Sequence, residues 1–445
     1  MPVQQQNRRS APAGRRADAD AFPGVEVGRV EPGDERRRSH VSSSREGGFS
    51  PAAPAAESAA TLYARLPERT PDRAAARGPG PCRGASVALA AVPRWTPARA
   101  RVGVGAGALG AVRGPLGSVA MDERKLGKTG RNVSAVGFGA WQIGAAWGDV
   151  SEEDALSALR TSVESGVSFI DTADVYGDGR SERLVGQILK EYPHLTVATK
   201  MGRRAPQEPG NYNPENLRSW NDDSRSNLGV DTIDLVQLHC PPDAVYASDA
   251  VFDDLDAMVS EGRIRSYGVS VETCAQALAA IERPGVASVQ IILNAFRHKP
   301  LEEVLPAARE AGVGVIARVP LASGLLSGRY TAQTSFGDDD HRNFNRAGDA
   351  FDVGETFSGV DFATGLAAVE RIREAVPDGM TMAQFALRWI LDQPGVSTVI
   401  PGARNAEQAR GNAAAAFLAP LPPEVHSTVR EVYDELVRPQ VHHRW

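Results

Sequence analysis

The region from Met121 to Trp445 predicts a (β/α)₈ barrel. Two observations favour this fold: short runs rich in β-branched residues alternate with amphipathic segments, and the alternation repeats eight times within about 325 residues. A doubly wound sheet is the competing arrangement. It is less favoured because eight evenly spaced units exceed its usual strand count, and because the glycine fingerprint of the chain lies outside the alternating region.

Eight segments are expected to be strands because they are short, apolar and rich in valine and isoleucine. In chain order they are residues 133–139, 168–173, 195–201, 233–239, 266–271, 288–294, 314–320 and 397–402.

The segments between the strands have the period of amphipathic helices. They are residues 151–165, 181–192, 213–229, 250–262, 274–282, 301–312, the pair 362–375 and 381–395, and 405–417. Ser151 precedes the first of them and is the expected N-cap.

Residues 1–120 differ from the rest of the chain in composition. They contain 18 arginines, no lysine and 10 acidic residues, whereas residues 121–445 contain 31 basic and 45 acidic residues. A segment rich in Ala, Pro, Arg, Gly and Ser without apolar periodicity is expected to be disordered. An arginine-rich nucleic-acid tail or a transit peptide is an alternative, but prolines and acidic residues interrupt it. The lack of lysine favours translated GC-rich upstream DNA, with the true start at Met121.

A glycine pattern in this extension resembles a dinucleotide fingerprint. Gly105, Gly107 and Gly110 have G-x-G-x-x-G spacing, but no long apolar strand precedes them, and Pro115 opposes a helix after them. We therefore do not expect a dinucleotide site there.

The overall composition excludes several classes of protein. The formal charge is −6 and no apolar run reaches 18 residues, so neither nucleic acid nor a membrane is an expected partner. The cysteines are Cys82, Cys240 and Cys274, an odd number without metal-ligand spacing. A reducing cytoplasmic location is the expectation, with neither a disulfide framework nor a zinc site.

Polar side chains follow three successive strands of the predicted barrel. Asp171 ends the second strand with Tyr176 in its loop, Lys200 ends the third, and His239 ends the fourth. Each has an ordinary alternative role, as a loop cap, a packed ring, a solvated strand end or a partner of a backbone carbonyl. Because catalytic groups of such barrels lie at the C-terminal strand ends, we expect the four to converge.

Reduction of a carbonyl by hydride is the chemistry that uses these four groups. Negative charge grows on the carbonyl oxygen, and a tyrosine with a pKa of about 10 is a sluggish proton donor near neutrality. Lys200 is expected to lower the pKa of Tyr176, Asp171 to hold the lysine in place, and His239 to donate to the carbonyl oxygen.

The motifs DTADVYG, ATK and LHCP resemble, in order and spacing, those of the aldo-keto reductase family, and the resemblance extends over residues 121–445. It implies a (β/α)₈ reductase that uses NADPH or NADH, with Asp171, Tyr176, Lys200 and His239 as its catalytic tetrad.

The resemblance also implies cofactor contacts. Val271 stands where the family usually has Asn, and Arg318 where an aromatic ring often stacks on the nicotinamide; a planar guanidinium can stack as well. Arg404 favours NADPH because it offers a charge to a 2′-phosphate, while NADH stays possible. The expected cofactor-binding residues are Ser270, Gln290 with Asn294 nearby, Arg318, Leu321, Gly402, Arg404, Gln408 and Asn412.

The expected substrate pocket lies beside the first strand, where Trp141 and Trp147 follow it, although core packing is the alternative for Trp147. Residues 335–359 are too long and polar for a simple connection and predict a lid or binding loop. The run Asp338 to His341 is not expected to bind a metal, because consecutive loop residues rarely present ligands to one ion.

The predicted function is NAD(P)H-dependent reduction of an aldehyde or ketone, with a small carbonyl compound as substrate. Two alternatives stay open: a cofactor-binding regulatory subunit like the potassium-channel β subunits that share this barrel, and a lyase or isomerase barrel. The physiological substrate and the oligomeric state do not follow from the sequence.

Overall fold

The structure is a computed structural model that describes residues 120–144, 150–338 and 340–445. The extension that precedes residue 120, with its glycine pattern and Cys82, lies outside the described residues, as do Trp147 and Asp339. The predictions made for those residues therefore stay predictions.

Eight parallel strands form the predicted barrel, with each strand paired to its neighbours in chain order from β3 to β10. Bridges from Val136 to Val399 and from Gly139 to Gly402 join the first strand to the last and close the ring. The strands are β3 (Phe138–Gly139), β4 (Phe169–Asp171), β5 (Thr196–Met201), β6 (Leu235–His239), β7 (Tyr267–Ser270), β8 (Val286–Ile292), β9 (Gly314–Arg318) and β10 (Val396–Val399).

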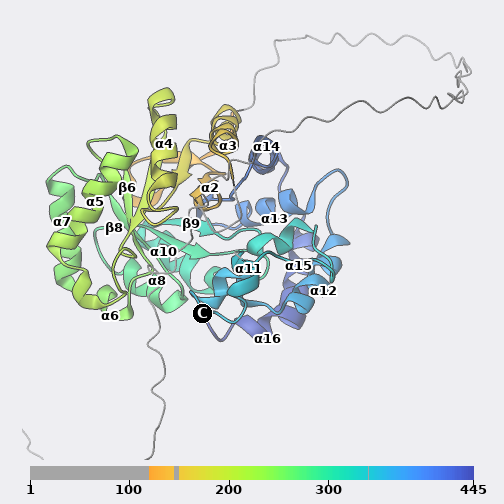
Figure 1. The fold of residues 1–445 in the computed structure, drawn as a ribbon. Helices are drawn as coiled ribbons and strands as arrows, with labels where there is room; N and C mark the ends of the chain where they lie inside the picture. Colours follow the sequence, from red (N-terminus) through yellow and green to blue (C-terminus); the bar gives the residue numbers. More distant parts are fainter. Residues whose placement is uncertain (1–119, 145–149, 339) are drawn as a thin grey trace, which may run out of the picture. The chain divides into compact units, whose positions relative to one another are not determined.

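Helices surround the strands on the outside of the barrel (Figure 1). The longer ones are α3 (Glu152–Glu164), α4 (Arg180–Glu191), α5 (Pro214–Leu228), α7 (Asp249–Ser260), α8 (Cys274–Ile281), α10 (Val304–Ala311), α12 (Phe362–Arg373), α13 (Met382–Leu391), α14 (Ala406–Ala414) and α15 (Pro423–Val432). The short ones are α2 (Trp141–Gly144), α6 (Asp243–Tyr246), α9 (Lys299–Glu302), α11 (His341–Phe344) and α16 (Arg438–Val441). The Ser151 hydroxyl accepts from the backbone N–H of Asp154, so the predicted N-cap of α3 is present.

The first predicted strand, residues 133–139, is divided in the structure, which corrects that prediction. Its start belongs to β2 (Asn132–Ser134), which pairs with β1 (Glu123–Lys125) in an antiparallel hairpin, and only its end joins the barrel as β3. Leu126 and Val133 of the hairpin pack with Phe169 and Ile316 from the barrel strands, because the interior of a closed barrel must be filled by side chains. The hairpin therefore plugs the end of the barrel opposite the strand C-termini.

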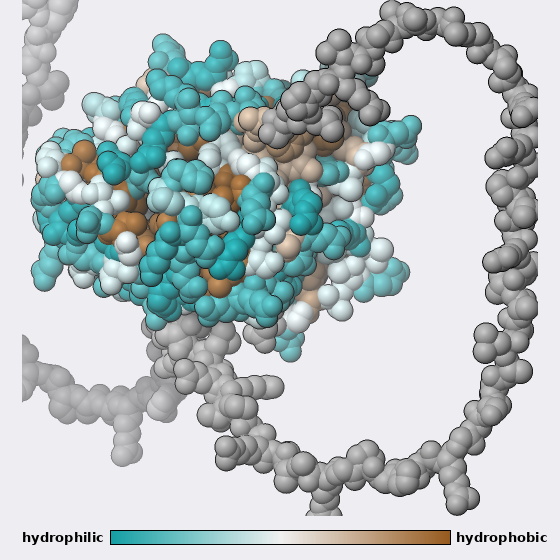
Figure 2. Space-filling model, turned by 90° about the horizontal axis from the view of Figure 1, so that it is seen from above, coloured by the Kyte–Doolittle hydropathy of each residue, from teal (hydrophilic) through white to brown (hydrophobic). Residues whose placement is uncertain are grey.

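A second core lies between the strands and the helices, and it uses most of the large apolar side chains. Figure 2 shows one face of the molecule, on which hydrophilic residues predominate and hydrophobic residues form small separate areas. Among the described residues Phe417 is the exposed large hydrophobic side chain, at 46%. None of the described helices is both long and apolar enough to span a bilayer.

Candidate active site

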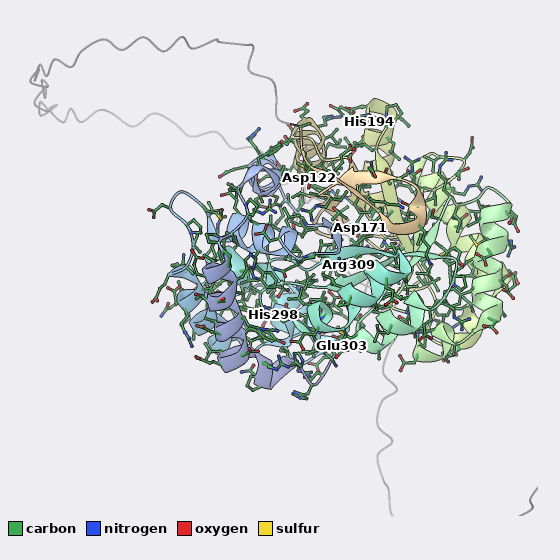
Figure 3. All side chains as sticks on the ribbon, turned by 180° about the vertical axis from the view of Figure 1, so that it is seen from behind. Asp122, Asp171, His194, His298, Glu303 and Arg309 are labelled. Carbon is green, nitrogen blue, oxygen red and sulfur yellow. The ribbon has the colours of Figure 1, made fainter. Side chains whose placement is uncertain are left out.

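The four predicted catalytic residues lie at the same end of three neighbouring strands. Asp171 ends β4, Lys200 lies one residue before the end of β5, and His239 ends β6. Tyr176 stands in the turn between β4 and α4. Parallel pairing of these strands brings the side chains to one point at the barrel mouth. Figure 3 shows Asp171 among the strands in the middle of the ribbon, whereas Asp122 and Glu303 lie further out.

The Lys200 ammonium lies between a carboxylate and the phenol. Its Nζ atom is 2.5 Å from Asp171 Oδ2, donates to the backbone oxygen of Thr172 at 2.9 Å, and is 3.4 Å from the hydroxyl oxygen of Tyr176. Lys200 and Asp171 are almost completely buried. Their ion pair offsets part of the free-energy cost of burying two charges. The carboxylate therefore orients the lysine, and the lysine faces the phenol.

Two carboxamides complete the surroundings of Asp171. Gln290 Nε2 donates to Asp171 Oδ1 at 2.7 Å, and Gln237 Nε2 donates to the same oxygen at 3.1 Å. Gln290 is predicted to contact the nicotinamide carboxamide; in the structure its amide nitrogen donates to Asp171, and the predicted cofactor contact stays a prediction. Gln237 did not figure in the sequence-based site, although it occupies β6 two residues before His239.

Burial controls the protonation states of the site. It raises the pKa of Tyr176 well above the ordinary value, and the negative charge of Asp171 adds to that effect. It lowers the pKa of Lys200, against the opposing attraction of Asp171. The structure therefore does not show the expected lowering of the Tyr176 pKa, because loss of hydration and the charge of Asp171 outweigh the effect of the nearby cations Arg203 and Arg318.

His239 is neutral in this environment. Burial lowers its pKa well below the ordinary value, and the cations Arg203 and Lys200 lower it further. Its ring lies edge-on to the Tyr176 ring, with centroids 5.9 Å apart. Arg203 Nε donates to the backbone oxygen of His239 at 3.2 Å, which holds the end of β6. A neutral imidazole beside the phenol can donate one N–H to a substrate oxygen.

Arg318, at the end of β9, is held between two carboxylates. Its guanidinium pairs with Glu355 and with Glu272 Oε2, the latter at 3.0 Å, and donates to the backbone oxygen of Val271 at 2.8 Å. Arg203 pairs with the other oxygen of Glu272 at 3.2 Å. We call these residues, Arg203, Glu272, Arg318 and Glu355, the charged cluster.

Burial and the neighbouring charges shift the pKa values of the two carboxyl groups in the charged cluster. Burial opposes ionisation of Glu272, but Arg318 and Arg203 outweigh it and lower the pKa of this carboxyl. Burial raises the pKa of Glu355, because Arg318 offsets only part of the lost hydration. Of the two carboxyl groups, Glu355 is therefore the one that is protonated more easily.

Three members of the charged cluster were missed in the sequence. Arg203 and Glu272 each lie two residues after a strand end, so charged residues at that position were a usable signal. Glu355 gave no such signal, because it lies in the insertion between β9 and α12, in the 3₁₀ turn η4 (Val353–Glu355). The insertion ends in a second 3₁₀ turn, η5 (Phe357–Gly359).

A cavity of about 1400 Å³ opens at the barrel mouth and reaches from the tetrad to the loop after β10. Trp141 forms part of its wall, with its ring stacked at 6.1 Å on Tyr176 and 6.2 Å from the ring of Phe351 in the insertion. Trp141 therefore lines the cavity beside Tyr176, and its contact with substrate stays a prediction. The expected lid also contributes, because Phe351, Asp352 and Glu355 line the cavity.

The predicted phosphate loop lies at the other end of the cavity, just before α14. Gly402, Arg404, Gln408 and Asn412 all line it. Gln408 Oε1 accepts from the backbone N–H of Arg404 at 2.9 Å, and Asn412 Nδ2 donates to the backbone oxygen of Gly402 at 3.0 Å. The two carboxamides therefore fix the shape of the loop.

The remaining predicted cofactor residues, apart from Asn294, also line this cavity. Ser270 ends β7 with a hydroxyl 3.6 Å from the Cys240 sulfur, and Leu321 follows β9. Gln290 and Arg318 line the cavity as well; they stand on the neighbouring strands β8 and β9, where Gln290 pairs with Ile316 and Arg318 with Ile292. Asn294 does not line the cavity; its Nδ2 atom donates to Val319 O and Ser358 Oγ, both at 2.8 Å.

The acidic run in the insertion takes a local structural role. The Asp340 side chain accepts from the backbone N–H of Arg342 and caps α11, and the guanidinium of Arg342 pairs with the same carboxylate. Among the described ranges, no group of three or more His, Cys, Asp or Glu side chains has the arrangement of a metal site.

A nicotinamide dinucleotide fits the side chains of this cavity. Gln142 Oε1 is buried without a hydrogen-bond partner within the described part of the chain, and it lies 2.4 Å from where a Cβ on Gly402 would stand. A glycine at that position leaves the cavity open beside an unused acceptor. The helix N-terminus of α14 and Arg404 supply positive potential at the same end, which suits a phosphate.

Comparisons with known proteins identify similar sequences and folds. The sequence model of the Aldo/keto reductase family matches residues 135–434. An aldo-keto reductase of Bacillus subtilis, YhdN, is 29% identical over 296 residues, which are 65% of this chain and 86% of the relative. A probable voltage-gated potassium channel subunit beta of Arabidopsis thaliana is 30% identical and covers 68% of this chain and 93% of its own. The glycerol dehydrogenase AKR11B4 of Gluconobacter oxydans superposes with a TM-score of 0.60 at 31% identity, covering 72% of this chain and 97% of its own.

Proposed function

The chain belongs to the aldo/keto reductase family and is an NAD(P)H-dependent oxidoreductase, and from that premise we propose that it reduces aldehydes or ketones to alcohols with Tyr176 as the proton donor. One observation carries the proposal: the Lys200 ammonium lies between Asp171 and the Tyr176 hydroxyl, at 2.5 and 3.4 Å, and the His239 ring stands against the same phenol.

When bound in this cavity, a nicotinamide dinucleotide would supply the hydride for the carbonyl carbon. The side chains of the barrel mouth handle the proton. The raised pKa of Tyr176 keeps the phenol protonated until it is needed, so the proton is present at the hydroxyl when charge develops on the substrate oxygen. His239, held neutral by burial, donates an N–H to the same oxygen and orients it.

Lys200 acts after the proton has left the phenol. The tyrosinate that forms is 3.4 Å from the ammonium, and Asp171 holds that ammonium in position through the short ion pair. The stabilisation grows as charge moves from the substrate oxygen to the phenol oxygen, and it is therefore an interaction that is strongest late in the reaction. The proton of Tyr176 is then restored from solvent.

Ser270, Leu321 and Gln290 would hold the nicotinamide end of the cofactor, and Gly402, Arg404, Gln408 and Asn412 the phosphate end. We propose NADPH as the preferred cofactor because Arg404 lines the cavity at the phosphate end. Arg404→Ala should weaken NADPH binding by about tenfold to a hundredfold and leave NADH nearly unchanged. Equal losses for the two cofactors, measured by fluorescence titration, would remove Arg404 from the 2′-phosphate site.

A panel of aldehydes and ketones, each assayed with NADPH and with NADH, tests the proposed activity. A regulatory cofactor-binding role is the second candidate, because one relative carries the name of a potassium channel subunit beta. Tight NADPH binding without turnover of any carbonyl compound would favour that role. Turnover that depends on Tyr176 would exclude it.

A further inference from the structure

The last residue of the chain is buried under the insertion between β9 and α12. Trp445 is 6% exposed, and its Nε1 atom donates to Asp352 Oδ1 at 3.1 Å. Its ring lies on the guanidinium of Arg297, with the guanidinium carbon 3.7 Å from the ring centroid. An indole that covers a cation and donates to a carboxylate makes two contacts that a merely space-filling residue would not make.

The Trp445 ring helps to stabilise the buried charge of Arg297. It is 2% exposed, and burial lowers its pKa to about 10. Its Nη2 atom donates to the backbone oxygen of Ser358 at 3.1 Å, and among the described residues it has no carboxylate at ion-pair distance. The electron-rich face of Trp445 therefore offsets part of the cost of burying this charge.

The insertion wraps closely around the indole. A Cβ on Gly359 would stand 2.4 Å from Cη2 of Trp445, and the φ of this glycine is +77°. A Cβ on Gly354 would stand 2.4 Å from Arg297 Nη2. Neither position leaves room for a side chain, so residues 352–359 are in direct contact with both Trp445 and Arg297.

The same segment carries the side chains that face the cavity. Glu355 lies between the two anchor points, Asp352 and Ser358, and pairs with Arg318 of the charged cluster. Phe351 is the residue before Asp352 and lies 6.2 Å from Trp141 across the pocket. Any movement of residues 352–359 would change the position of both side chains.

We propose that Trp445 is a positioning residue of the substrate pocket: together with Arg297 it holds residues 352–359 against the barrel, so that Phe351 and Glu355 keep their places in the cavity wall. Its kinetic consequence rests on the proposed reduction of carbonyl compounds. The catalytic tetrad stands on β4, β5, the adjoining turn and β6, and within the described part of the chain the hydrogen bonds and ring contacts of Trp445 go to other elements. We call the contacts of Trp445 with Asp352 and Arg297 the clamp. Loss of the clamp should therefore raise KM for the carbonyl substrate more than it lowers kcat.

The test uses the full chain with three substitutions. Trp445→Ala removes both contacts, Trp445→Phe keeps a ring over Arg297 but removes the N–H that reaches Asp352, and His443→Ala changes an exposed residue two positions away as a matched control. Two readouts are needed: kcat and KM for a carbonyl substrate, and the rate of tryptic cleavage after Arg346, an exposed residue of the insertion.

Trp445→Ala should raise KM about tenfold with kcat within about twofold of wild type, and should speed cleavage after Arg346 by about fivefold. Trp445→Phe should fall between Trp445→Ala and wild type, and His443→Ala should match wild type.

Three outcomes would overturn the inference: unchanged cleavage in Trp445→Ala, faster cleavage without a change in KM, or an equal acceleration of cleavage at every site together with a loss of kcat, which is the behaviour of a general loss of stability. The cleavage rate also separates this inference from the proposed function. If the wild type reduces no carbonyl compound, the proposed reduction is contradicted. Faster cleavage after Arg346 in Trp445→Ala would still support the contacts of Trp445 with the insertion.

Discussion

Asp171, Lys200 and His239 stand on strands that pair with their neighbours in the barrel. Phe351 and Glu355 stand instead in an insertion whose backbone hydrogen bonds close local turns and whose contacts with the barrel include the ion pair of Glu355 with Arg318. The first region is built by backbone pairing, which leaves a side chain little freedom once the register is set. The second depends on Arg318, Arg297 and the last residue of the chain. The wall formed by the strand ends is therefore suited to catalytic groups that must keep fixed positions. The wall formed by the insertion is suited to adjusting the fit of the substrate.

The backbone of the second region is strained as well as weakly paired. Val319 has a φ of +51°, Ser323 of +52° and Phe357 of +52°, values that side-chain-bearing residues rarely adopt. Their cost, roughly 1–3 kcal/mol each, requires surrounding contacts that hold them. The Ser323 hydroxyl does so by donating to Glu355 O at 2.7 Å and accepting from the N–H of Phe357 at 3.1 Å.

The largest expected effect belongs to the strand-built region. Tyr176→Phe removes the proton donor, so kcat should fall at least about a hundredfold while the dissociation constant of NADPH stays nearly unchanged. Steady-state kinetics and a fluorescence titration measure the two quantities. Tyr212→Phe, which removes a buried hydroxyl bonded to Gln207, is the matched control. Retention of more than about a tenth of wild-type turnover in Tyr176→Phe would remove this residue from the mechanism.

A smaller effect of a different kind is expected in the insertion. Glu355→Gln replaces one of the two carboxylates at Arg318 by a neutral group, which should loosen the lid and raise KM for the carbonyl substrate about tenfold, with kcat largely kept. Glu424→Gln makes the same change of charge on the exposed face of α15 and should leave both constants alone. A drop in kcat with unchanged KM would erase the distinction between the two regions.

The free energy of unfolding should depend on pH because the Asp174 carboxyl, in the strand-built region, is buried. Burial raises the pKa of Asp174 to about 8, Glu182 adds to the shift, and Arg204 and Lys200 oppose it. The folded state therefore keeps a proton that the unfolded chain releases near pH 4, so stability falls as the pH rises from about 4 to about 8. Asp174→Asn imitates the protonated acid and removes this slope.

Melting curves at pH 5 and pH 8 check this expectation. The gain in Tm from Asp174→Asn over wild type should be at least about 3 °C larger at pH 8 than at pH 5. A gain that is the same at both pH values would mean that Asp174 is ionised throughout.

The smallest expected effect concerns residues 1–120. Every residue to which chemistry is assigned lies after Met121, so a chain that starts at Met121 should keep kcat/KM within about twofold and should melt at the same temperature. A truncated protein that melts several degrees lower would instead give the extension a role in the fold. Loss of a salt-dependent DNA affinity on truncation would identify it as a nucleic-acid tail.

The sequence predicted the strand-built region well because local pattern determines it. Alternation of apolar runs with amphipathic helices located the barrel strands from the second to the eighth, and a parallel barrel then requires Asp171, Lys200 and His239 to meet at one end. The exception was the first strand, where the filling of the barrel interior by Leu126 and Val133 divides residues 133–139 between a hairpin and the barrel.

The insertion could not be predicted in the same way, because its contacts join residues far apart in the chain. Glu355 reaches Arg318, and Asp352 reaches Trp445 across 93 residues, with no periodicity to indicate either pair. Arg318 illustrates the difficulty: the sequence does not indicate that Glu272 and Glu355 both pair with its guanidinium. Its expected stacking on the nicotinamide stays a prediction.

The rate of NADPH oxidation in a single turnover, at a saturating carbonyl concentration, tests the division between the two regions most directly, because it excludes substrate binding and product release from the measurement. The comparison is between wild type, Tyr176→Phe and Glu355→Gln. We predict that Tyr176→Phe slows this step at least about a hundredfold and that Glu355→Gln stays within about twofold of wild type. Equal slowing in both variants, or none in Tyr176→Phe, would contradict the assignment of the chemistry to the strand ends.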